Sequence, residues 1–555
     1  MSFSVVATQC THWHSIELVS MVPTCMISAS WHPHPQHVWP FQRHGSHCSH
    51  SASKNYRRSS IVLMHPCAAG SLLSLDYTAT TLPITCSSSS HSILCLSNGH
   101  GEDSIAASIL SHLSALGEER GVEMRIEALP LVGEGHAYRR QGIVTLGPAK
   151  TMPSGGFIYM DVLQLIGDVR AGLLALTLQQ WEAVTHWVDR NPDGVLLAVG
   201  DVVPLAFAWL ASQRLKKSKA SRGSFAFVGT AKSEFYVRGS DGTRLTSTSW
   251  LQNLEFLLSA GSVYYPWERA MMSDSQCRLV VPRDDLTAHY LQKHLPHSQS
   301  TKVQSLGNPM MDDLKPTGGL SFLANYEPAK FVAVLPGSRA PEIYRNWKQL
   351  LLVAEEVSIS QDKLAFLVPI VPALEPSLFM DALVDARWQP HALQLHVEKM
   401  GELKSSAWAY DVRNLQVERL ENWPANNGVA LVAFEKGNAV IILIRGNFND
   451  VAHWADAGIA MAGTATEQLV GQGKPVFTIP GEGPQFTAAF ADAQSRLLGE
   501  SVVLESNTKE LARRMKDVLS NADELLRIAN NGRMRMGAPG ASSSISHQFW
   551  KRMLQ

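Results

Sequence analysis

The 555-residue chain has almost no net charge and few cysteines outside its first ninety residues. Its 48 Lys and Arg residues are balanced by 49 Asp and Glu, which gives a net charge of −1. The chain therefore lacks the excess of one sign that marks a nucleic-acid binder or a polyacidic chain. Beyond position 90 only Cys95 and Cys277 occur, and two distant thiols form neither a disulfide framework nor a zinc cluster. We expect a folded part that occupies a reducing compartment, holds no metal and binds no nucleic acid.

The sequence also lacks a membrane span. Its most apolar window, residues 195–211, approaches the length required, but Gly200, Asp201 and Pro204 interrupt it. A buried strand, a turn and a helix that carries the proline in its first turn explain all three residues. With 45% hydrophobic and 17% charged residues, the composition is that of a globular protein with large cores.

Residues 1–90 differ in composition from the rest of the chain. They contain two acidic residues, four Lys or Arg, eighteen Ser and nine His. A Ser-rich, acid-poor segment with scattered Arg is typical of an organelle transit peptide, so we expect a disordered segment over 1–90. The histidines lack ordered ligand spacing, which argues against a metal site. A mispredicted start codon is the alternative explanation.

From His91 onward, short apolar runs alternate with helical patterns, which favours parallel sheets covered by helices. The first half is expected to place strands at Ile93–Leu96, Met124–Ala128, Val195–Val199, Phe225–Val228, Val263–Tyr265 and Arg278–Val281. The second half is expected to place them at Phe331–Leu335, Leu364–Val368, Val429–Phe434, Val440–Ile444, Gly458–Met461 and Val476–Ile479. The pattern predicts an α/β fold with two Rossmann-like, doubly wound domains that face a cleft. We place these domains at 91–318 and 319–535, with a C-terminal helix in 536–555.

Four polar loops follow apolar strands in this scheme: residues 97–103, 200–201, 336–339 and 462–468. In open parallel sheets, ligands bind beyond the carboxyl ends of the strands. We therefore expect these four loops to line the cleft.

Two of the loops have the chemistry of phosphate sites. In Pro336-Gly-Ser-Arg339, Gly337 permits close backbone approach, Ser338 supplies a hydroxyl, and Arg339 offers a fork matched to phosphate oxygens. In Gly463-Thr-Ala-Thr466, backbone N–H groups and two hydroxyls lie at a helix start. A tight turn with a solvated Arg and an ordinary helix cap are the alternatives. Neither loop matches a P-loop.

The other two loops carry candidate proton acceptors. Asn98-Gly-His-Gly-Glu-Asp103 combines a base with two carboxylates, and Asp201 directly follows an apolar strand. We expect His100, Asp103 or Asp201 to accept a proton from a hydroxyl during group transfer, and the sequence leaves the choice among them open. The acids in the first loop could instead favour a helix dipole, and Asp201 could be an N-cap.

The order of five motifs resembles lipid-A-disaccharide synthase, and more closely the related proteins of cyanobacteria and plastids. The motifs are Asn98-Gly-His-Gly-Glu-Asp103, Leu306-Gly-Asn-Pro-Met310, Val334-Leu-Pro-Gly-Ser-Arg339, Gly463-Thr-Ala-Thr466 and Gly473-Lys-Pro475. The resemblance runs from about Ile93 to the end of the chain. It implies a GT-B fold and an inverting hexosyltransferase that moves a sugar from a UDP-sugar to a lipid or lipid-like acceptor. It also implies a chloroplast location, the second domain as the donor site and the first as the acceptor site.

The resemblance also assigns roles to residues and implies that the enzyme needs neither metal nor other cofactor. Asp201 corresponds to the family's strand-end base, His100 lies in a loop with a comparable role in a related glycosyltransferase, and Asp103 matches the first-loop acid. The residues expected to bind the donor are Gly337, Ser338, Arg339, Gly463, Thr464, Thr466, Glu467 and Gln468.

Three further expectations follow from this resemblance. Gln468 stands where the family has the carboxylate that grips the donor ribose, which motivates the alternative of a non-catalytic binding or scaffold protein on the same fold. A UDP-sugar 2-epimerase is the second alternative, because it shares the architecture. A lipid acceptor implies peripheral membrane contact, for which residues 154–157 and 160–166 could form a docking lip.

Overall fold

Two parallel sheets, each built from short apolar runs, organise the chain. The computed structural model describes residues 90–149, 172–217, 223–245, 256–326, 330–359, 363–391, 425–426, 429–483 and 485–555, and Ser88–Gln555 forms one unit. The expected transit segment 1–90 lies almost entirely outside the described residues, and the expected docking lip at 154–157 and 160–166 lies outside them completely.

The first sheet has six parallel strands in the order β3-β2-β1-β4-β5-β6. Their bounds are Ser90–Ser97 (β1), Glu123–Pro130 (β2), Val144–Thr145 (β3), Val195–Gly200 (β4), Ser224–Gly229 (β5) and Cys277–Val281 (β6). This is the Rossmann strand order.

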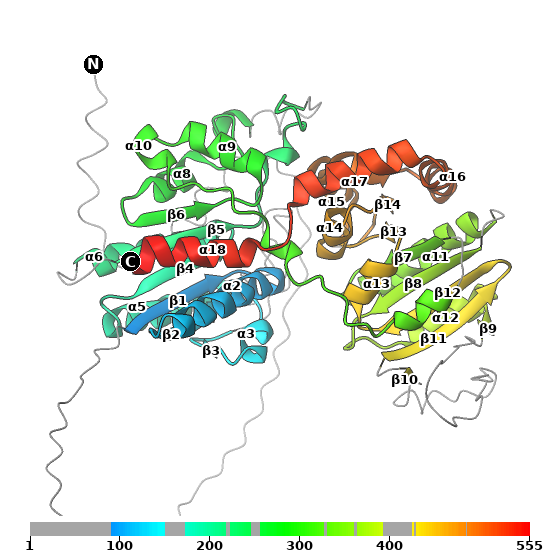
Figure 1. Ribbon diagram of the computed structural model, residues 1–555, viewed down its shortest axis with the longest axis horizontal. Helices are drawn as coiled ribbons and strands as arrows, with labels where there is room; N and C mark the ends of the chain where they lie inside the picture. The colour runs from blue at the N-terminus through cyan, green and yellow to red at the C-terminus, as the bar shows by residue number, and fades with distance from the viewer. Residues whose placement is uncertain are drawn as a thin grey trace, which may run out of the picture. The chain divides into compact units, whose positions relative to one another are not determined.

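Helices cover both faces of this sheet, which is why its central strands are apolar throughout. Ile93 and Cys95 of β1 pack in a core with α2 (His100–Glu119) and α18 (Ala541–Phe549). Leu94 and Leu96 point to the opposite face, where α5 (Leu173–Arg190) and α6 (Val202–Lys217) complete a second core. Figure 1 shows α2 and α18 on the same face of the sheet, so the C-terminal helix packs against the first sheet and not the second.

The second sheet repeats the same order and adds an antiparallel edge. Its parallel part runs β12-β8-β7-β13-β14-β15, and β11, β10 and β9 extend it beyond β12. The bounds are Lys330–Leu335 (β7), Leu364–Ile370 (β8), Gln389–His391 (β9), Ala425–Asn426 (β10), Val429–Lys436 (β11), Ala439–Arg445 (β12), Ala457–Ala460 (β13), Val476–Thr478 (β14) and Val502–Leu504 (β15).

The strands of the second sheet also divide their side chains between two cores. Val332 and Val334 of β7 face α11 (Glu342–Ser358), whereas Ala333 and Leu335 face α13 (Phe448–Trp454) and α14 (Thr464–Gly471).

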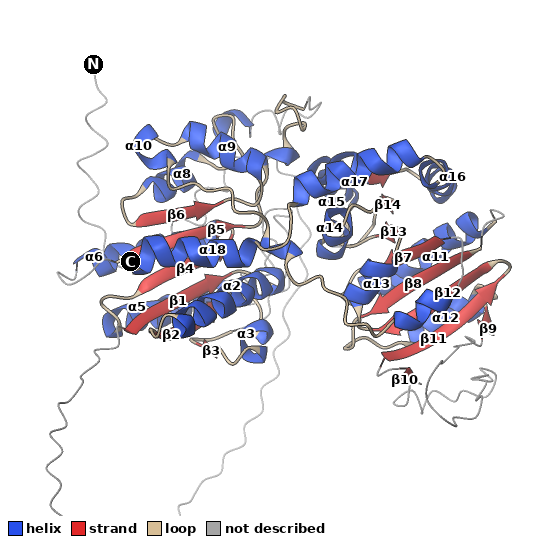
Figure 2. Ribbon diagram, in the orientation of Figure 1, coloured by secondary structure: helices blue, strands red, loops and turns tan. Residues whose placement is uncertain are grey.

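The remaining helices of the described residues are α3 (His136–Arg140), α8 (Pro266–Ser273), α9 (Asp285–His294), α10 (His297–Ser300), α12 (Ser377–Asp385), α15 (Ala488–Leu498), α16 (Thr508–Leu519) and α17 (Ala522–Met536). Short helical turns are η1 (Glu234–Tyr236), η2 (Pro309–Met311), η3 (Ser321–Asn325), η6 (Gly499–Ser501) and η7 (Trp550–Leu554). Figure 2 shows the alternation of strands and helices in both halves.

The fold prediction is confirmed, because two doubly wound Rossmann-like sheets are the architecture of the GT-B class. One expected strand, Val263–Tyr265, is wrong. The Val263 N–H donates to Glu234 Oε1 at 3.0 Å and not to a neighbouring strand, so this segment leads into α8 as a loop. The expected strands Val429–Phe434 and Val440–Ile444 form, but as an antiparallel hairpin.

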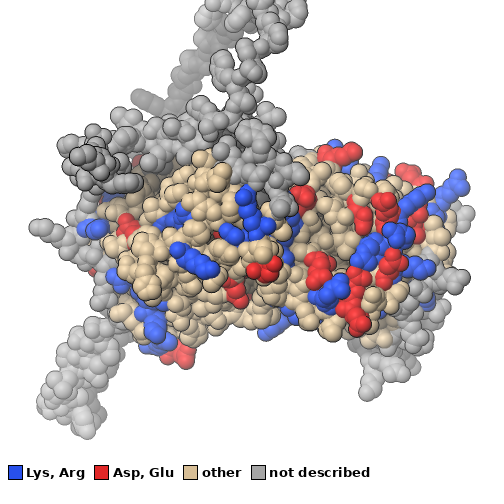
Figure 3. Space-filling model, turned by 90° about the horizontal axis from the view of Figure 1, so that it is seen from above, with Lys and Arg blue, Asp and Glu red and all other residues tan. Residues whose placement is uncertain are grey.

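The surface of the described residues agrees with the balanced composition. On the face seen in Figure 3, Lys and Arg side chains lie interspersed with Asp and Glu. Among the residues that the structure describes, no helix combines the length and the apolar character that crossing a bilayer requires.

Candidate functional site

The topology brings the four predicted loops together in two pairs. In the first sheet, the strand order reverses between β1 and β4, so the connections that follow these strands leave toward opposite faces. Residues 97–103 and 200–201 lie at that point. In the second sheet the order reverses between β7 and β13, where residues 336–339 and 462–468 lie. Such a switch point is where open α/β sheets bind ligands.

At the first switch point, a chain of hydrogen bonds ends on Asp103. The Tyr138 hydroxyl donates to Ser97 Oγ at 2.5 Å, and the Ser97 hydroxyl donates to Asp103 Oδ1 at 2.6 Å. Asp103 is only 1% exposed, and its Oδ2 has no hydrogen-bond partner among the described residues. Burial raises the pKa of Asp103 to about 7, although the bond from Ser97 opposes the shift. Asp103 can therefore carry or release a proton near neutral pH.

Gly133 closes a small space between His100 and Asp103. Its φ is +105°, and a Cβ atom there would lie 3.4 Å from His100 Cε1 and 3.6 Å from Asp103 Oδ2. The imidazole and the unbonded carboxylate oxygen thus both lie close to Gly133, whose positive φ favours glycine at this position.

His100 lies exposed at the start of α2. Partial loss of hydration lowers the pKa of its imidazole, and the positive charges of Arg339 and His136 lower it further, whereas Glu134 opposes them. The ring is therefore mostly neutral at pH 7 and can accept a proton. Because Arg339 belongs to the second half of the chain, its charge links the two switch points.

Asp201 both caps α6 and contributes a second buried acid. Its Oδ1 accepts from the Val203 N–H at 2.9 Å, and the residue is 7% exposed. Burial raises the pKa of Asp201 to about 6, while the Val203 N–H, a bond from Asn98 and the charge of Lys232 lower it. The N-cap interpretation is therefore correct in geometry, and the carboxylate still titrates near neutrality.

Glu102 is a third acid at this edge. Loss of hydration raises its pKa to about 7, and the charges of Asp201 and Asp103 add to the shift. The Thr230 hydroxyl donates to Glu102 Oε1 at 3.4 Å. Three carboxylates that resist ionisation thus share one edge of the sheet, a concentration typical of functional sites.

At the second switch point, the two loops touch. Gly337 has a φ of +108°, and a Cβ atom there would lie 3.4 Å from the carbonyl oxygen of Met461. The buried Asn346 amide donates to the Pro336 carbonyl at 3.0 Å and so fixes the turn. Ser338 is exposed and Arg339 is half-buried, so both predicted side chains lie at the surface of this switch point.

The start of α14 offers fewer hydroxyls than expected. Thr464 is exposed, but Thr466 is buried and its hydroxyl donates to the Ala462 carbonyl at 2.8 Å. The buried Gln494 amide donates to the carbonyls of Ala462 (3.1 Å) and Gly463 (3.3 Å). The loop is therefore held from behind and presents Thr464 and the backbone of Gly463.

Glu467 and Gln468 both have partners in the chain. Arg283 Nη2, which follows β6, donates to Glu467 Oε2 at 2.6 Å in a buried ion pair. The Gln468 amide donates to the Met310 carbonyl at 3.1 Å. Both side chains thus connect the second half of the chain to segments before it, and their expected contact with a donor stays a prediction.

Sequence reasoning missed several supporting residues, because their partners are distant in the chain. Ser97 lies in the predicted loop 97–103, but Tyr138, which donates to it, is 41 positions away and was not predicted. Glu342, at the start of α11, accepts the N–H of Phe486 at 2.7 Å, and an ideal Cβ on Gly483 would lie on top of the Glu342 carboxylate. No local signal in the sequence marks that contact.

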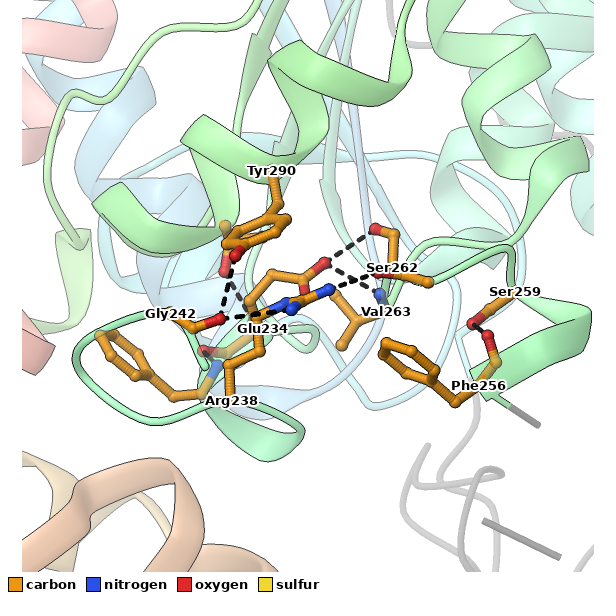
Figure 4. Close-up of polar contacts among 12 residues, drawn as sticks. Glu234, Arg238, Gly242, Phe256, Ser259, Ser262, Val263 and Tyr290 are labelled. Atoms are coloured by element: carbon orange, nitrogen blue, oxygen red, sulfur yellow. Dashed lines mark hydrogen bonds and ion pairs between the residues drawn. The ribbon is translucent and has the colours of Figure 1, made fainter. Parts of the chain in front are cut away.

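The loop after β5 is fixed by a fully bonded ion pair (Figure 4). Arg238 Nε donates to Glu234 Oε2 at 3.0 Å, and its other nitrogens donate to the carbonyls of Gly242 (3.3 Å) and Gly261 (2.7 Å). Its guanidinium lies 3.9 Å from the centre of the Tyr290 ring. Because every charged group here has partners, the cluster positions the loop and offers no binding site.

Two hollows among the described residues lie away from these loops. One, of about 580 Å³, is lined by His289, Gln292, Lys293, Leu295, His297, Ser300 and Thr301. The other, of about 530 Å³, is lined by His112, Asp312, Asp313, Lys315, Pro539 and Gly540. Within the described ranges, no three His, Cys, Asp or Glu residues are grouped as metal ligands. The candidate site therefore rests on the chemistry of the switch points and not on cavity size.

No protein-family description matches the sequence, and no curated protein matches it either. Among solved structures, the chain is similar to UDP-GlcNAc 2-epimerase of Neisseria meningitidis bound to UDP-GlcNAc (13% identity, TM-score 0.44, covering 83% of this chain and 100% of that one). It is also similar to Acinetobacter baumannii MurG (12%, 0.42, 83% and 99%) and to a UDP-glucosyltransferase of Polygonum tinctorium (12%, 0.48, 84% and 100%). Similarity at this level says nothing about the reaction, which has to be derived from the residues of the site.

Proposed function

We propose that this chain is an inverting glycosyltransferase that moves a sugar from a UDP-sugar to a lipid or lipid-like acceptor. One observation carries the proposal: the ion pair of Arg283, after β6, with Glu467 of α14 at 2.6 Å joins the strand ends of the two sheets, and the charge of Arg339 beside the second switch point reaches His100 at the first. A group suited to phosphate and a neutral base thus lie within electrostatic reach of each other, each at the ligand-binding edge of its own sheet.

The second half supplies the donor site in this proposal. Arg339 and the exposed Ser338 bind the diphosphate, and the starts of α11 and α14 direct backbone N–H groups toward it. When the bond between the anomeric carbon and the phosphate oxygen breaks, the electron pair leaves with UDP. The guanidinium and the helix ends stabilise that negative charge.

His100 accepts the proton of the attacking hydroxyl. The hydroxyl oxygen forms a bond to the anomeric carbon from the side opposite to the leaving UDP, which inverts the configuration. His100 is exposed at the site, whereas Asp103 and Asp201 are 1% and 7% exposed. The two buried acids are therefore not the base that meets the acceptor, and Asp103 Oδ2 and His100 Cε1 lie 3.6 Å and 3.4 Å from the position of an ideal Cβ on Gly133.

The acceptor class is supported by an apolar feature of the first half. Leu257 and Leu258 are 71% and 60% exposed, and Arg244 nearby places its guanidinium 4.2 Å from the centre of the Phe256 ring. Adjacent exposed leucines with cationic neighbours are suited to peripheral contact with a lipid surface. Flotation of the protein with and without phosphatidylglycerol vesicles tests this contact, and recovery of the protein only in the lipid-free fraction would contradict it.

Calorimetry with UDP and UDP-GlcNAc tests the donor site. The wild-type chain should bind UDP, and Arg339→Ala should weaken binding more than tenfold, because a charged hydrogen bond contributes about 1.5–3 kcal/mol. Arg513→Ala is the matched control, since Arg513 is exposed on α16 of the same half. Absence of UDP binding, or equal affinity in wild type and Arg339→Ala, would contradict the proposal.

Product analysis separates the three candidate activities. A transferase releases UDP from UDP-GlcNAc only when a lipid extract is added, and His100→Ala should abolish this release. An epimerase, which the cluster of three titrating carboxylates also fits, converts the nucleotide sugar without an acceptor. UDP binding without either reaction identifies a non-catalytic binding protein.

A plastid location is part of the proposal and rests on the transit-peptide-like composition of residues 1–90 together with the resemblance to plastid proteins. Fusion of these residues to a fluorescent protein in plant cells tests it. Fluorescence confined to the cytosol would remove the location and leave the reaction unaffected.

A further inference from the structure

The side chain of Trp267 is unusually exposed to solvent for an aromatic residue of this protein. It is 47% exposed, and it is the single Trp or Phe side chain in the exposed class among the residues that the structure describes. Its ring is stacked on Tyr265, with centroids 4.4 Å apart and planes 7° from parallel. Tyr265 covers one side of the indole, and the remaining exposed aromatic surface of Trp267 is suited to packing against another ring.

The aromatic pair is rigidly held. Tyr265 is the N-cap of α8, and its N–H donates to Glu268 Oε2 at 2.7 Å. The same oxygen accepts from Lys232 Nζ at 2.7 Å, and this ammonium lies 4.7 Å from the centre of the Tyr265 ring. Glu268 is 1% exposed. The stacked pair of Tyr265 and Trp267, called the platform below, is therefore fixed before any ligand arrives, which reduces the entropy cost of binding.

The platform lies next to the first switch point. An ideal Cβ on Gly229, the last residue of β5, would lie 2.3 Å from the Tyr264 hydroxyl. Gly229 pairs with Gly200 in the neighbouring strand, and Gly200 is followed by Asp201. Lys232 is also close enough for its charge to act on Asp201.

Solvent exposure rises from Asp201 through Lys232 and Tyr265 to Trp267. Asp201 is buried (7% exposed), Lys232 and Tyr265 are half-buried, and Trp267 is 47% exposed. The side chains thus lead from the buried acid of the switch point outward to the indole.

We propose that Trp267 and Tyr265 form an acceptor subsite that stacks on a carbohydrate ring of the acceptor. The inference rests on the proposed function and deepens it, because it identifies the acceptor as a glycolipid-like molecule. The C–H face of a pyranose carries partial positive charge and packs on the negative face of an aromatic ring. The stacked rings of Trp267 and Tyr265, with the Lys232 ammonium beside Tyr265, provide such a face in the first half of the chain, which is the proposed acceptor domain.

The test uses the full chain and two soluble probes, octyl β-D-glucopyranoside below its micellar concentration and 1-octanol. Saturation-transfer NMR measures contact with probe protons, and a titration gives the affinity. The wild type should saturate the glucose ring protons most strongly. Trp267→Ala should weaken binding of the glucoside about tenfold, and Trp267→Phe should restore part of it. Leu526→Ala, an exposed residue on α17, is the control that should leave binding unchanged.

The outcomes separate this inference from the proposed function. UDP binding is measured on the same proteins and should not change in Trp267→Ala. If UDP binds normally while the glucoside does not bind the wild type, or binds Trp267→Ala equally well, the subsite inference is overturned alone. Equal loss of octanol and glucoside binding overturns it too, because the indole would then contact an alkyl chain. Failure of UDP to bind the wild type overturns the proposed function instead.

Discussion

Replacement of Asp103 by Asn should change how stability depends on pH. The pKa of Asp103 is about 7 in the folded chain and 3.8 in its ordinary state. The folded state therefore binds more protons between pH 4 and 7, and its free energy of unfolding falls as the pH rises through that range. A shift of about 3 pKa units corresponds to a loss of about 4 kcal/mol, and the nearly complete burial of Asp103 leaves little solvent screening to reduce it.

The amide that Asp103→Asn introduces has its own cost, which does not depend on pH. Its carbonyl oxygen accepts a hydrogen bond from the Ser97 hydroxyl as the carboxylate does. Its NH₂ group replaces the carboxylate oxygen that has no partner among the described residues, and burying this unsatisfied donor costs about 1–3 kcal/mol. Asp103→Asn should therefore be less stable than wild type at pH 4 and more stable at pH 8.

Urea unfolding of wild type and Asp103→Asn across pH 4–8 checks this expectation. The difference between the two proteins should change by about 4 kcal/mol over the range, and this change is independent of the cost of the amide. Asp193→Asn is the control, because Asp193 is exposed on the turn before β4 and its loss should leave the profile parallel to wild type. Parallel profiles for Asp103→Asn and wild type would refute the reasoning.

Three further substitutions test the geometry of the two switch points. Gly133→Ala, at a φ of +105° and 3.4 Å from His100, should lower turnover at least tenfold with little change in UDP affinity, as steady-state kinetics and calorimetry would show. Glu467→Ala should destabilise the chain by about 3–5 kcal/mol, because it leaves Arg283 buried without its anion, and the additional change Arg283→Met should recover part of the loss in urea unfolding. Gly483→Ala should displace the buried Glu342 carboxylate from the Phe486 N–H, which costs about 1–3 kcal/mol, so thermal unfolding should show a lower melting temperature.

Much of the architecture could be predicted from the sequence because its signals are local. A fully buried parallel strand such as β4 is a continuous apolar run, and each of its residues is buried. The loops at 97–103 and 336–339 could be placed at a ligand edge because each directly follows such a run. The strand order itself has no local signal, yet it pairs the four loops at two switch points.

The errors and omissions have a common physical cause. Val263–Tyr265 has a strand-like composition, but a distant carboxylate, Glu234, takes its backbone N–H. Thr466 and Glu467 are both bonded inside the protein, which the sequence did not indicate, and their contact with a donor stays a prediction. Composition predicts which groups could bind a ligand, whereas long-range packing decides which of them remain accessible.

The first switch point concentrates acids that folding alone would not favour. Burial raises the pKa values of Glu102, Asp103 and Asp201 to about 7, 7 and 6, so the folded chain loses stability as the pH rises from the ordinary pKa values to these, and the loss is complete above them. A purely structural role would be met better by apolar or amide side chains, which carry no such penalty. Groups that titrate near neutrality beside a neutral imidazole are suited to proton transfer. The acids therefore favour a chemical role for the first half over the scaffold alternative, and loss of turnover in His100→Ala with UDP affinity retained is the result that this reasoning requires.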